Sequence, residues 1–559
     1  MSGDRRTPPP QQPFTLSIQA QARNDTYTPP IVTYQATPAS QPDDAEGCYR
    51  RANALREQRR FGEALAAFDR AIALQPRHAE AHNGRGIALA SLQRFDEAIT
   101  AFDTAVTLKP DYAEAYNNRG LVLHDLNRLD AALSSFDRAI ALRPDDPRVH
   151  KNYGALLEDL KRFEDAVDSY DSAIALQPDD ADAHNNRGLA LLKLGQFDPA
   201  LASFDTAIAL NPGYAEAYSN RGVALEDLNR LGAAAADFDK AVALRPEFSE
   251  AGSNLAHCLL KMGRFERGWQ LHEWRKRTPK PVGNRTFAQP LWLGRENILN
   301  ATVFVHFEQG LGDTIQFSRY GKLLKERGAK VVMSVQEPLY PLLKQMSPDI
   351  RVIKGSEVPS QFDYHCPLMS LPLAFGTTLQ TIPRERRYVV ADETLRKAWE
   401  GRLSAPTRKR IGVVWRGNPD HRNDHNRSIA LSSIAPLFSI DAHWVSLQKE
   451  LAPEDATALA EFPQILEIGT ELQDFSDTAA VIEGLDLVIA VDTSIAHLAG
   501  AMGKPVWILL PFNADWRWLA NRDDSPWYPS AKLYRQADIG RWDGVVARVQ
   551  AALQDFVRP

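Results

Sequence analysis

The chain has 559 residues, of which 44% are hydrophobic and 24% are charged, and its formal net charge is -6. A chain of this length is expected to divide into several domains, because single cores stop growing well before it. The negative balance argues against a nucleic-acid-binding protein, since such proteins usually present a basic face. No run of about 18 apolar residues is present, so we expect no membrane span.

The cysteines and the first residues of the chain indicate the cellular compartment in which the protein is expected. Cys48, Cys258 and Cys366 are scattered and show no C-x-x-C spacing, which is typical of reduced thiols. The start of the chain lacks the apolar segment of a secretory signal. These features predict a cytoplasmic protein.

Residues 1–41 are rich in Pro, Gln, Thr and Ser and show no sustained period. Such a composition cannot bury enough apolar surface to fold, so a disordered tail is predicted here. A short docking motif within the tail is the alternative.

Prolines then recur every 34 residues, a period typical of the tetratricopeptide helix-turn-helix unit. They are Pro42, Pro76, Pro110, Pro144, Pro178, Pro212 and Pro246. A glycine stands ten residues after five of these prolines, at Gly86, Gly120, Gly154, Gly188 and Gly222. A residue without a side chain there would let the first helix of a unit approach the second closely.

The second helix of each unit has its own pattern. An alanine and, four residues later, an aromatic residue lie one turn apart on the same helix face, as at Ala98 and Phe102. With the proline period, this pattern resembles the tetratricopeptide repeat family over residues 42–278. The resemblance implies an α superhelix of seven 34-residue units.

The seventh unit departs from the pattern. Gly268 replaces the alanine and His272 the aromatic residue. Terminal repeats are usually atypical because they cap the stack or dock to a neighbouring domain. We expect docking, with Trp269 and Trp274 as apolar contacts.

Asparagines stand eight residues after five of the prolines, two residues before the glycine position. They are Asn118, Asn152, Asn186, Asn220 and Asn254. Two residues turn about 200° around a helix, so these side chains should face away from the second helix. An amide both donates and accepts, so such a ladder could hold the backbone of an extended peptide; bonding only within or between hairpins is the alternative. The arrangement resembles the asparagine ladder of O-linked N-acetylglucosamine transferases, which favours a peptide groove.

The pattern changes after the repeats. Residues 279–296 read as a linker. Apolar strand-like runs then alternate with helical stretches, which indicates β-α-β units and parallel sheets. Examples of the strand-like runs are 302–306, 331–335, 410–415, 443–447, 485–491 and 506–510. Two α/β domains are predicted, over residues 297–404 and 405–559.

A glycine-containing loop follows the first predicted strand. Gly310 and Gly312 would let a ligand approach the backbone. Asp313 would lie at a helix start beside the carboxyl edge of the sheet, where open α/β sheets bind ligands. A carboxylate there could accept a proton from an attacking hydroxyl; a plain helix-capping role is the alternative.

A second motif follows the predicted strand at 485–491. Asp492, Thr493 and Ser494 lead into a short helix that contains His497. The free N–H groups at such a helix start suit a diphosphate, and the hydroxyls add donors. The alternative is a helix cap followed by a core histidine.

Together the two motifs resemble the GT-B glycosyltransferases, and most closely the bacterial heptosyltransferase-like family, over about residues 297–535. The resemblance implies two Rossmann-like domains, a general base at Asp313, and nucleotide-sugar binding by Asp492, Thr493 and His497. Ser494 replaces the family's glycine. The resemblance also implies a cation for the diphosphate.

Two arginines could supply that cation. Arg427 lies where the family places it, and Arg416, after the strand at 410–415, is a second candidate. The alternative for each arginine is that it only forms an ion pair at the protein surface and does not bind the diphosphate.

Tryptophans crowd the stretch 515–529. Trp516, Trp518 and Trp527 could stack on a sugar or a base, or pack in a core or between domains. No His, Cys, Asp or Glu set has convincing metal-ligand spacing, so neither a metal nor a cofactor is expected.

The sequence and its resemblances therefore predict a metal-independent glycosyltransferase fused to tetratricopeptide repeats, and the family resemblance implies that it inverts the sugar. Its donor would be a nucleotide-diphospho-sugar, and its acceptor a protein or peptide held by the repeat groove. Two alternatives stay open: a non-catalytic protein-binding scaffold with a degenerate transferase half, and a transferase that acts on a saccharide.

Overall fold

The computed structural model describes residues 44–278, 285–405, 407–420 and 423–558. The predicted tail over residues 1–41 and the first part of the predicted linker over 279–296 lie outside these residues. Two compact units are present, one ending at Arg221 and the other beginning at Gly222. The predicted boundaries near residues 278 and 404 both fall inside the second unit.

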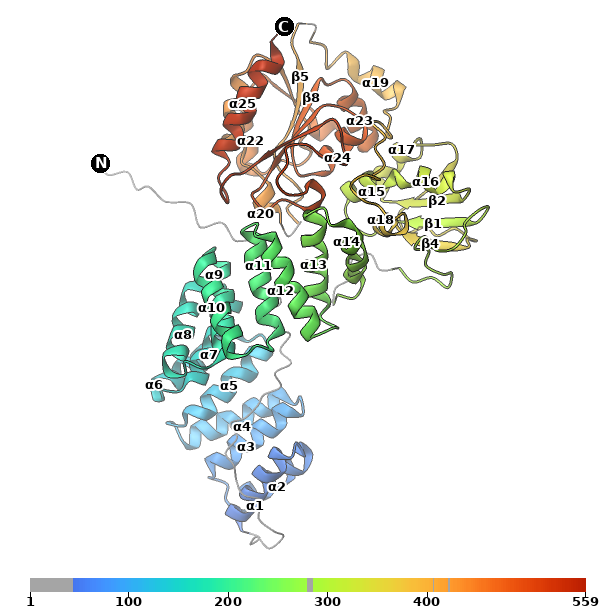
Figure 1. Cartoon of the computed structure of the whole chain (residues 1–559). Coiled ribbons are helices and arrows are strands. Elements are labelled where there is room, and N and C mark those ends of the chain that lie inside the picture. Colours follow the sequence, from blue (N-terminus) through green and yellow to red (C-terminus); the bar gives the residue numbers. More distant parts are fainter. Residues whose placement is uncertain (1–43, 279–284, 406, 421–422, 559) are drawn as a thin grey trace, which may run out of the picture. The chain divides into compact units, whose positions relative to one another are not determined.

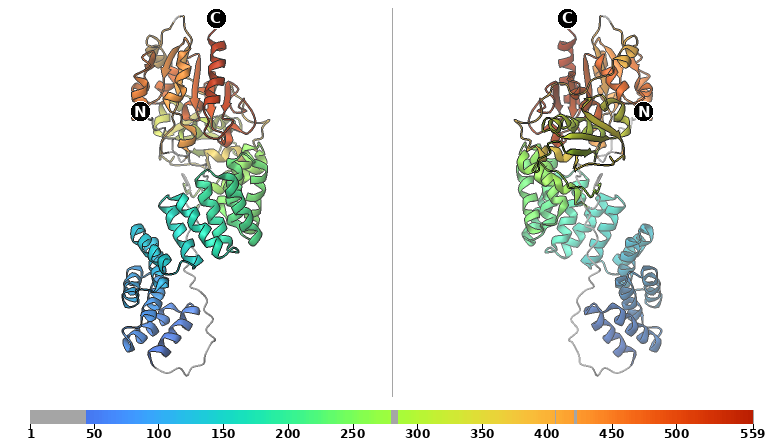
Figure 2. Two further views of the ribbon diagram at one scale, coloured as in Figure 1. Left: turned by 90° about the vertical axis from the view of Figure 1, so that its left-hand side faces the viewer. Right: turned by 90° about the vertical axis from the view of Figure 1, so that its right-hand side faces the viewer.

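The first unit consists of consecutive helix pairs, stacked in chain order (Figures 1 and 2). Its helices are α1 (Ala45–Glu57), α2 (Phe61–Leu74), α3 (Ala79–Ser91), α4 (Phe95–Leu108), α5 (Ala113–Asp125), α6 (Leu129–Leu142), α7 (Pro147–Asp159), α8 (Phe163–Leu176), α9 (Ala181–Lys193), α10 (Phe197–Leu210) and the first part of α11 (Ala215–Asp227).

Glycine and an aromatic ring fix how closely the two helices of a pair approach. A Cβ built on Gly120 would lie 2.7 Å from the Phe136 ring, and one on Gly188 would lie 2.6 Å from the Phe204 ring. Both rings are fully buried. The glycine predicted from the repeat pattern is therefore required by a close approach, as expected.

The turn inside each pair is closed by a residue with positive φ. This left-handed position follows the C-cap of the first helix, where glycine is usual. The residues there are Arg59, Gln93, Asn127, Lys161, Gly195, Asn229 and Gly263. The repeat thus tolerates side chains at a position that favours glycine.

The second unit begins with the remaining helix pairs and continues into two sheets. Its first helices are the rest of α11, α12 (Leu231–Leu244), α13 (Ser249–Lys261), α14 (Phe265–His272) and the 3-10 helix η1 (Glu273–Lys276).

Trp269 packs edge-on against Trp516 and donates its indole N–H to the Thr377 carbonyl at 3.0 Å. Trp274 instead lies against Gly252 of α13. Of the two predicted docking tryptophans, only Trp269 contacts the sheet region in these interactions.

The first sheet is parallel, with strand order β3-β2-β1-β4. Its strands are β1 (Thr302–His306), β2 (Lys330–Val335), β3 (Ile350–Lys354) and β4 (Tyr364–Pro367). The associated helices are α15 (Leu311–Ser318), α16 (Tyr320–Glu326), α17 (Tyr340–Leu343) and α18 (Leu371–Ala374). The next helix, α19 (Glu393–Glu400), packs against the helix Phe475–Glu483 of the second sheet region.

The second sheet is also parallel, with strand order β10-β9-β8-β5-β6-β7; Figure 1 labels its central strands β5 and β8. Its strands are β5 (Arg410–Val414), β6 (His443–Ser446), β7 (Ile465–Glu467), β8 (Leu487–Val491), β9 (Val506–Leu510) and β10 (Ala531–Arg535). Its helices are α20 (Asp424–Arg427), α21 (Leu431–Ile434), α22 (Pro453–Leu459), α23 (Phe475–Glu483), α24 (Ser494–Ala501) and α25 (Asp543–Val557).

This strand order is that of a doubly wound sheet, in which successive strands are added first on one side of the first strand and then, after a reversal, on its other side. The reversal lies between β5 and β8 in the second sheet and between β1 and β4 in the first. Ligands of open α/β sheets bind outside the carboxyl ends of strands at such a point. Both predicted motifs follow a strand at one of these reversals.

Candidate functional site

Asp313 lies in the first turn of α15, directly after the loop that follows β1. One of its carboxylate oxygens accepts the backbone N–H of Gly310 at 2.9 Å, which caps the helix. The other oxygen forms an ion pair with Arg517. Asp313 therefore caps α15 and at the same time binds Arg517, which belongs to the second sheet region.

The loop before α15 rests on the second motif. A Cβ built on Gly312 would lie 2.7 Å from the His497 ring, so no other residue would fit there without a shift. Helices α15 and α24 also pack against each other. The structure thus brings together the two motifs that the sequence had placed far apart.

His497 lies on the buried side of α24. Its Nδ1 lies 2.9 Å from the Tyr528 hydroxyl, and its ring stacks on Trp518 with centroids 5.1 Å apart. Its Nε2 is 3.9 Å from a carboxylate oxygen of Asp492. Burial, aided by Arg517, lowers the pKa of His497 to about 3, so the imidazole is neutral near pH 7.

Thr493 and Ser494 occupy the start of α24 as predicted. Thr493 is the N-cap residue, yet its side chain makes no capping hydrogen bond. Its hydroxyl is buried and has no hydrogen-bond partner within the described part of the chain. A buried hydroxyl is usually paired, so this one is free to donate to a ligand at the helix start. Ser494 is the first residue of the helix and is half-buried.

Arg517 joins Asp313, Asp492 and His497 in one charged cluster. It is not among the site residues predicted from the sequence. Its guanidinium bridges Asp313 and Asp515, with 2.8 Å to the Asp515 carboxylate, and it is 8% exposed. Burial lowers the pKa of Arg517, but the two carboxylates outweigh burial and raise it. Its position between Trp516 and Trp518 in a stretch with charges of both signs is the signal of this residue in the sequence.

The cluster shifts the pKa values of its two aspartates. Burial raises the pKa of Asp313 above its ordinary value, although Arg517 opposes the shift. Burial and then the charge of Asp515 raise the pKa of Asp492 to about 6. Buried carboxylates with raised pKa values are common at sites of proton transfer.

The two candidate arginines differ in position. Arg427 donates to the Asp492 carbonyl at 2.9 Å and pairs with Asp424 at 3.1 Å. Arg416 pairs with Glu454 at 2.8 Å and with the buried Asp455. Arg427 therefore lies beside the start of α24, whereas Arg416 is held by acidic partners on α22.

The three tryptophans are packing residues in this structure. Trp516, Trp518 and Trp527 are at most 4% exposed. Trp516 and Trp527 pack around Trp269, and Trp518 packs on His497. Of the two interpretations of this stretch, burial favours core packing over an open sugar-stacking surface.

The predicted asparagine ladder lies between consecutive hairpins. Amide groups of Asn118, Asn152 and Asn220 each donate to an asparagine 35 residues earlier, at 2.9–3.0 Å. Asn186 accepts from Asn185 at 3.2 Å. Asn254 is 2% exposed, and its amide nitrogen has no partner in the described residues.

These bonds match the alternative in which the amides join the hairpins. Asn118 and Asn220 are also buried, whereas Asn152 and Asn186 are half-buried. A role for any of them in holding a peptide stays a prediction.

The described residues contain neither a candidate metal site nor a candidate membrane span. No group of three or more His, Cys, Asp or Glu side chains there could hold a metal ion. No described helix is long and apolar enough to cross a membrane.

Two family profiles match the helical part of the chain. One sequence profile, described as Tetratricopeptide repeat, matches residues 49–113, 88–147 and 185–247, and another, described as TPR repeat, matches 156–195. These stretches are tetratricopeptide repeats. Repeats of this kind stack into extended surfaces that bind proteins or peptides.

One curated relative is Protein FlbA of Caulobacter vibrioides, which is 25% identical over 333 residues, or 54% of each chain. The chain thus spans about half the length of this relative.

Two solved structures show likeness over about a third of the chain. YrrB, described as a TPR protein with an unusual peptide-binding site, is 25% identical, with 33% of this chain and 95% of that one covered and a TM-score of 0.30. PilF of Pseudomonas aeruginosa is 17% identical, with 37% and 94% covered and a TM-score of 0.34.

Proposed function

We propose that the sheet region is a glycosyltransferase of GT-B architecture that uses a nucleotide-diphospho-sugar. The observation that carries this proposal is the meeting of the two motifs at the reversal points of two doubly wound sheets. Gly312 touches His497, and Asp313 is paired with an arginine that comes from the second sheet region. In open α/β folds, ligands bind outside the carboxyl ends of the strands at such reversal points, so the contact between the two motifs supports a shared site for a donor and an acceptor.

The donor would bind mainly at the start of α24. Its diphosphate would accept hydrogen bonds from the free N–H groups of the first turn and from the Thr493 hydroxyl, which lacks a partner among described groups. Arg427, beside Asp492, would neutralise the diphosphate charge. Arg416 is less suited, because its guanidinium already pairs with two carboxylates.

Asp313 would act as the general base. Its carboxylate would take the proton of the acceptor hydroxyl while the acceptor oxygen forms a bond to the anomeric carbon. The bond from that carbon to the diphosphate would break, and the nucleoside diphosphate would leave with the electron pair. A raised pKa suits this step, because a base works best when its pKa approaches the operating pH.

The acceptor would be a protein or peptide delivered by the tetratricopeptide repeats. Such repeats bind proteins, and the last repeat pair packs through Trp269 against Trp516, the neighbour of Arg517, and against Trp527. A saccharide acceptor is the alternative within the enzyme proposal. Mass spectrometry of the products would separate glycosylated protein from glycosylated glycan.

A non-catalytic scaffold is the second candidate, and the pairing of Asp313 favours it. Both carboxylate oxygens are already used, one by Gly310 and the other by Arg517. Ser494 also replaces the glycine that the resembling family has at the donor site. In this candidate the sheets only support the protein-binding repeats.

Donor binding tests the proposal. A panel of nucleotide-sugars is added to the full chain, and a bound donor should raise the melting temperature, since it stabilises only the folded protein. If no member of the panel binds at millimolar concentration, the enzyme proposal is wrong and the scaffold is preferred.

The variant Asp313→Asn tests the chemical step. It should keep the cap on α15 and donor binding but lose transfer by a factor of about 10²–10⁴, because general base catalysis is removed. The control is Asp474→Asn, which changes an aspartate that caps α23 and should leave transfer unchanged. Equal transfer by wild type and Asp313→Asn would remove Asp313 from the mechanism.

A further inference from the structure

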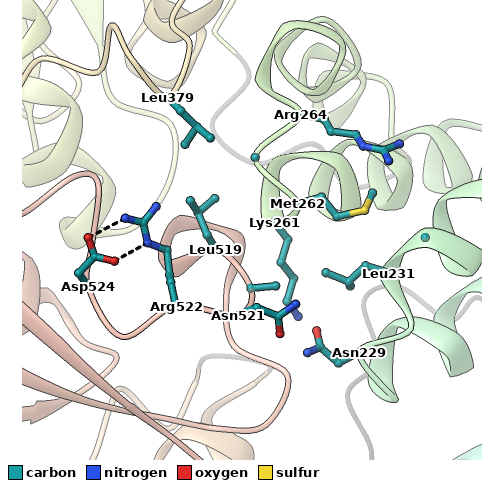
Figure 3. A pocket seen from close by; sticks show the side chains of 13 residues that line it. Asn229, Leu231, Lys261, Met262, Arg264, Leu379, Leu519, Asn521, Arg522 and Asp524 are labelled. Carbon is teal, nitrogen blue, oxygen red and sulfur yellow. Dashed lines mark hydrogen bonds and ion pairs between the residues drawn. The ribbon is translucent and has the colours of Figure 1, made fainter.

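A cavity of about 680 Å³, lined by none of the candidate-site residues, lies between the last repeat pairs and the loop that follows Trp518 (Figure 3). Its size is within the usual range for a bound ligand. Its walls are Asn229, Leu231, Gly232, Lys261, Met262, Gly263, Arg264, Leu379, Leu519, Ala520, Asn521, Arg522 and Asp524. A second cavity of about 370 Å³ shares Leu379, Arg522 and Asp524 with it and adds Arg384. The two together form one extended depression.

Positive charge dominates this depression. Arg264, Arg384 and Arg522 line it, and Asp524 is the acidic residue among its lining side chains. Lys261 also lines it, but its ammonium group is buried and contacts Asn513. Asp524 is taken by Arg522 in a two-fold hydrogen bond of 2.7 Å. Arg264 and Arg384 are exposed and form no ion pair with any described residue. Guanidinium groups bind carboxylates in two-fold fashion, so an acidic ligand matches this surface.

Apolar side chains lie among the charges. Leu231, Met262 and Leu379 line the first cavity, and Leu519, at 4% exposed, lines it as well. Figure 3 shows the Arg522–Asp524 pair on one side of the cavity and Lys261, Asn229 and Leu231 on the other. A ligand that fits must therefore carry an apolar group between its charges.

The loop that forms one wall is held in a strained conformation. Leu519 has φ 53° and ψ 174°, a region that only glycine adopts readily. Arg535 donates to the carbonyls of Trp518 and Leu519 at 2.6 and 2.7 Å, and Ala520 donates its N–H to the Lys261 carbonyl at 2.9 Å. Strain that neighbouring groups maintain is typical of binding sites. The wall is thus preorganised against the repeat helices.

We propose that this depression binds an acidic peptide segment in which carboxylates flank an apolar side chain. Arg264 and Arg384 would pair with the carboxylates, and the leucines and Met262 would cover the apolar side chain. The repeats that form one wall belong to a class that binds peptides, which favours a peptide over a small anion. This site does not depend on the proposed transferase activity.

Fluorescence anisotropy of a labelled peptide tests the proposal on the full chain. The probe is an octapeptide with two central leucines and three glutamates on each side, measured at about 50 mM salt, where charge pairing is weakly screened. It should bind, and the double variant Arg264→Glu/Arg384→Glu should weaken binding by about tenfold or more. Arg70→Glu, which reverses an exposed arginine on α2, is the matched control and should bind as wild type.

Two further peptides define the chemistry. Replacing the glutamates by serines, or the leucines by serines, should each weaken binding. The proposal is wrong if the probe does not bind at millimolar concentration, if the serine-for-glutamate peptide binds equally well, or if the double variant and Arg70→Glu behave alike. Competition by inorganic phosphate as strong as by unlabelled peptide would also contradict a peptide site. Circular dichroism melting of each variant checks that the fold is retained.

Discussion

At the scale of single residues, one side chain often has a local and a long-range partner. Asp313 caps its own helix through Gly310 and also pairs with Arg517, which is 204 residues further along the chain. The cap could be anticipated from the sequence, because aspartate in a first helical turn accepts free backbone N–H groups. The ion pair could not, because nothing in the local sequence of Asp313 specifies which distant arginine will lie beside it.

Glycine at the repeat position should be far more sensitive to substitution than glycine elsewhere in these helices. Gly120→Ala places a Cβ 2.7 Å from the Phe136 ring, and such overpacking costs about 1–3 kcal/mol. Alanine favours a helix over glycine by about 1 kcal/mol, so a net loss of local stability is expected. Hydrogen exchange over α5 and α6 measures it.

Gly62→Ala is the matched control, because nothing lies within 4 Å of the new methyl group. It should slow exchange in α2, or leave it unchanged. Slower exchange in α5 and α6 of Gly120→Ala would show that the helices can separate without cost.

At the scale of elements, strands in the centre of each sheet were easier to predict than those at the edges. The predicted runs at 302–306 and 506–510 match β1 and β9 in full. Strands β3, β4, β7 and β10 are not among the runs that stood out in the sequence. β3 and β10 are edge strands in which charged and apolar residues are mixed, and β7 has three residues. Edge strands carry charges because one side faces solvent, so they lack the continuous apolar run of a buried parallel strand.

The turn between α7 and α8 offers a test of local strain. Lys161 has φ 59°, and a left-handed conformation costs a residue with a side chain about 1–2 kcal/mol. Lys161→Gly should therefore stabilise this hairpin by about 0.5–1 kcal/mol, after the larger conformational entropy of glycine in the unfolded chain is subtracted. Slower hydrogen exchange in α7 and α8 would report it.

Lys161→Ala separates backbone strain from loss of the side chain, because alanine keeps the strain. It should give no stabilisation. Equal effects of alanine and glycine would rule out strain at Lys161 as the cause.

At the scale of the molecule, the second unit buries charged groups where the last repeats meet the second sheet region. The Asn513 side chain contacts both Lys261 and Asp227, and all three residues are at most 5% exposed. Glu226 lies beside them at 4% exposure, with one carboxylate oxygen unpartnered within the described residues. Buried charges of this kind are costly unless they are paired, so this junction should depend on pH.

Glu226 sets the direction of that dependence. Burial raises its pKa to about 7, although Lys261 opposes the shift, whereas an unfolded glutamate titrates near 4.3. The folded state therefore binds more protons between these values, and stability falls as the pH rises from about 4.3 to 7. The contribution is on the order of 3 kcal/mol.

Glu226→Gln removes this loss, since glutamine stays neutral. Relative to wild type, the variant should melt at a clearly higher temperature at pH 8 and at nearly the same temperature at pH 4, measured by calorimetry. Glu247→Gln, which changes an exposed glutamate, should shift neither value. A Glu226→Gln difference that is independent of pH would show that its carboxyl does not titrate on unfolding.

The sequence by itself determined the repeats, because most hairpins are specified by short-range signals that recur with the same period. Glycine, aromatic residue and proline all act within one unit, so their spacing is visible without a structure. It also placed Asp313 and Asp492 at strand ends, because strand and helix starts are local features.

Only the tertiary structure decided which of these groups meet. The contact of Gly312 with His497, the ion pair of Asp313 with Arg517, and the charged cavity beside Lys261 all join segments far apart in the chain. Such contacts depend on how whole sheets and helices pack, and no local spacing encodes them. The asparagines show the same division: their period was evident from the sequence, but their bonds to the preceding hairpin came from the stacking.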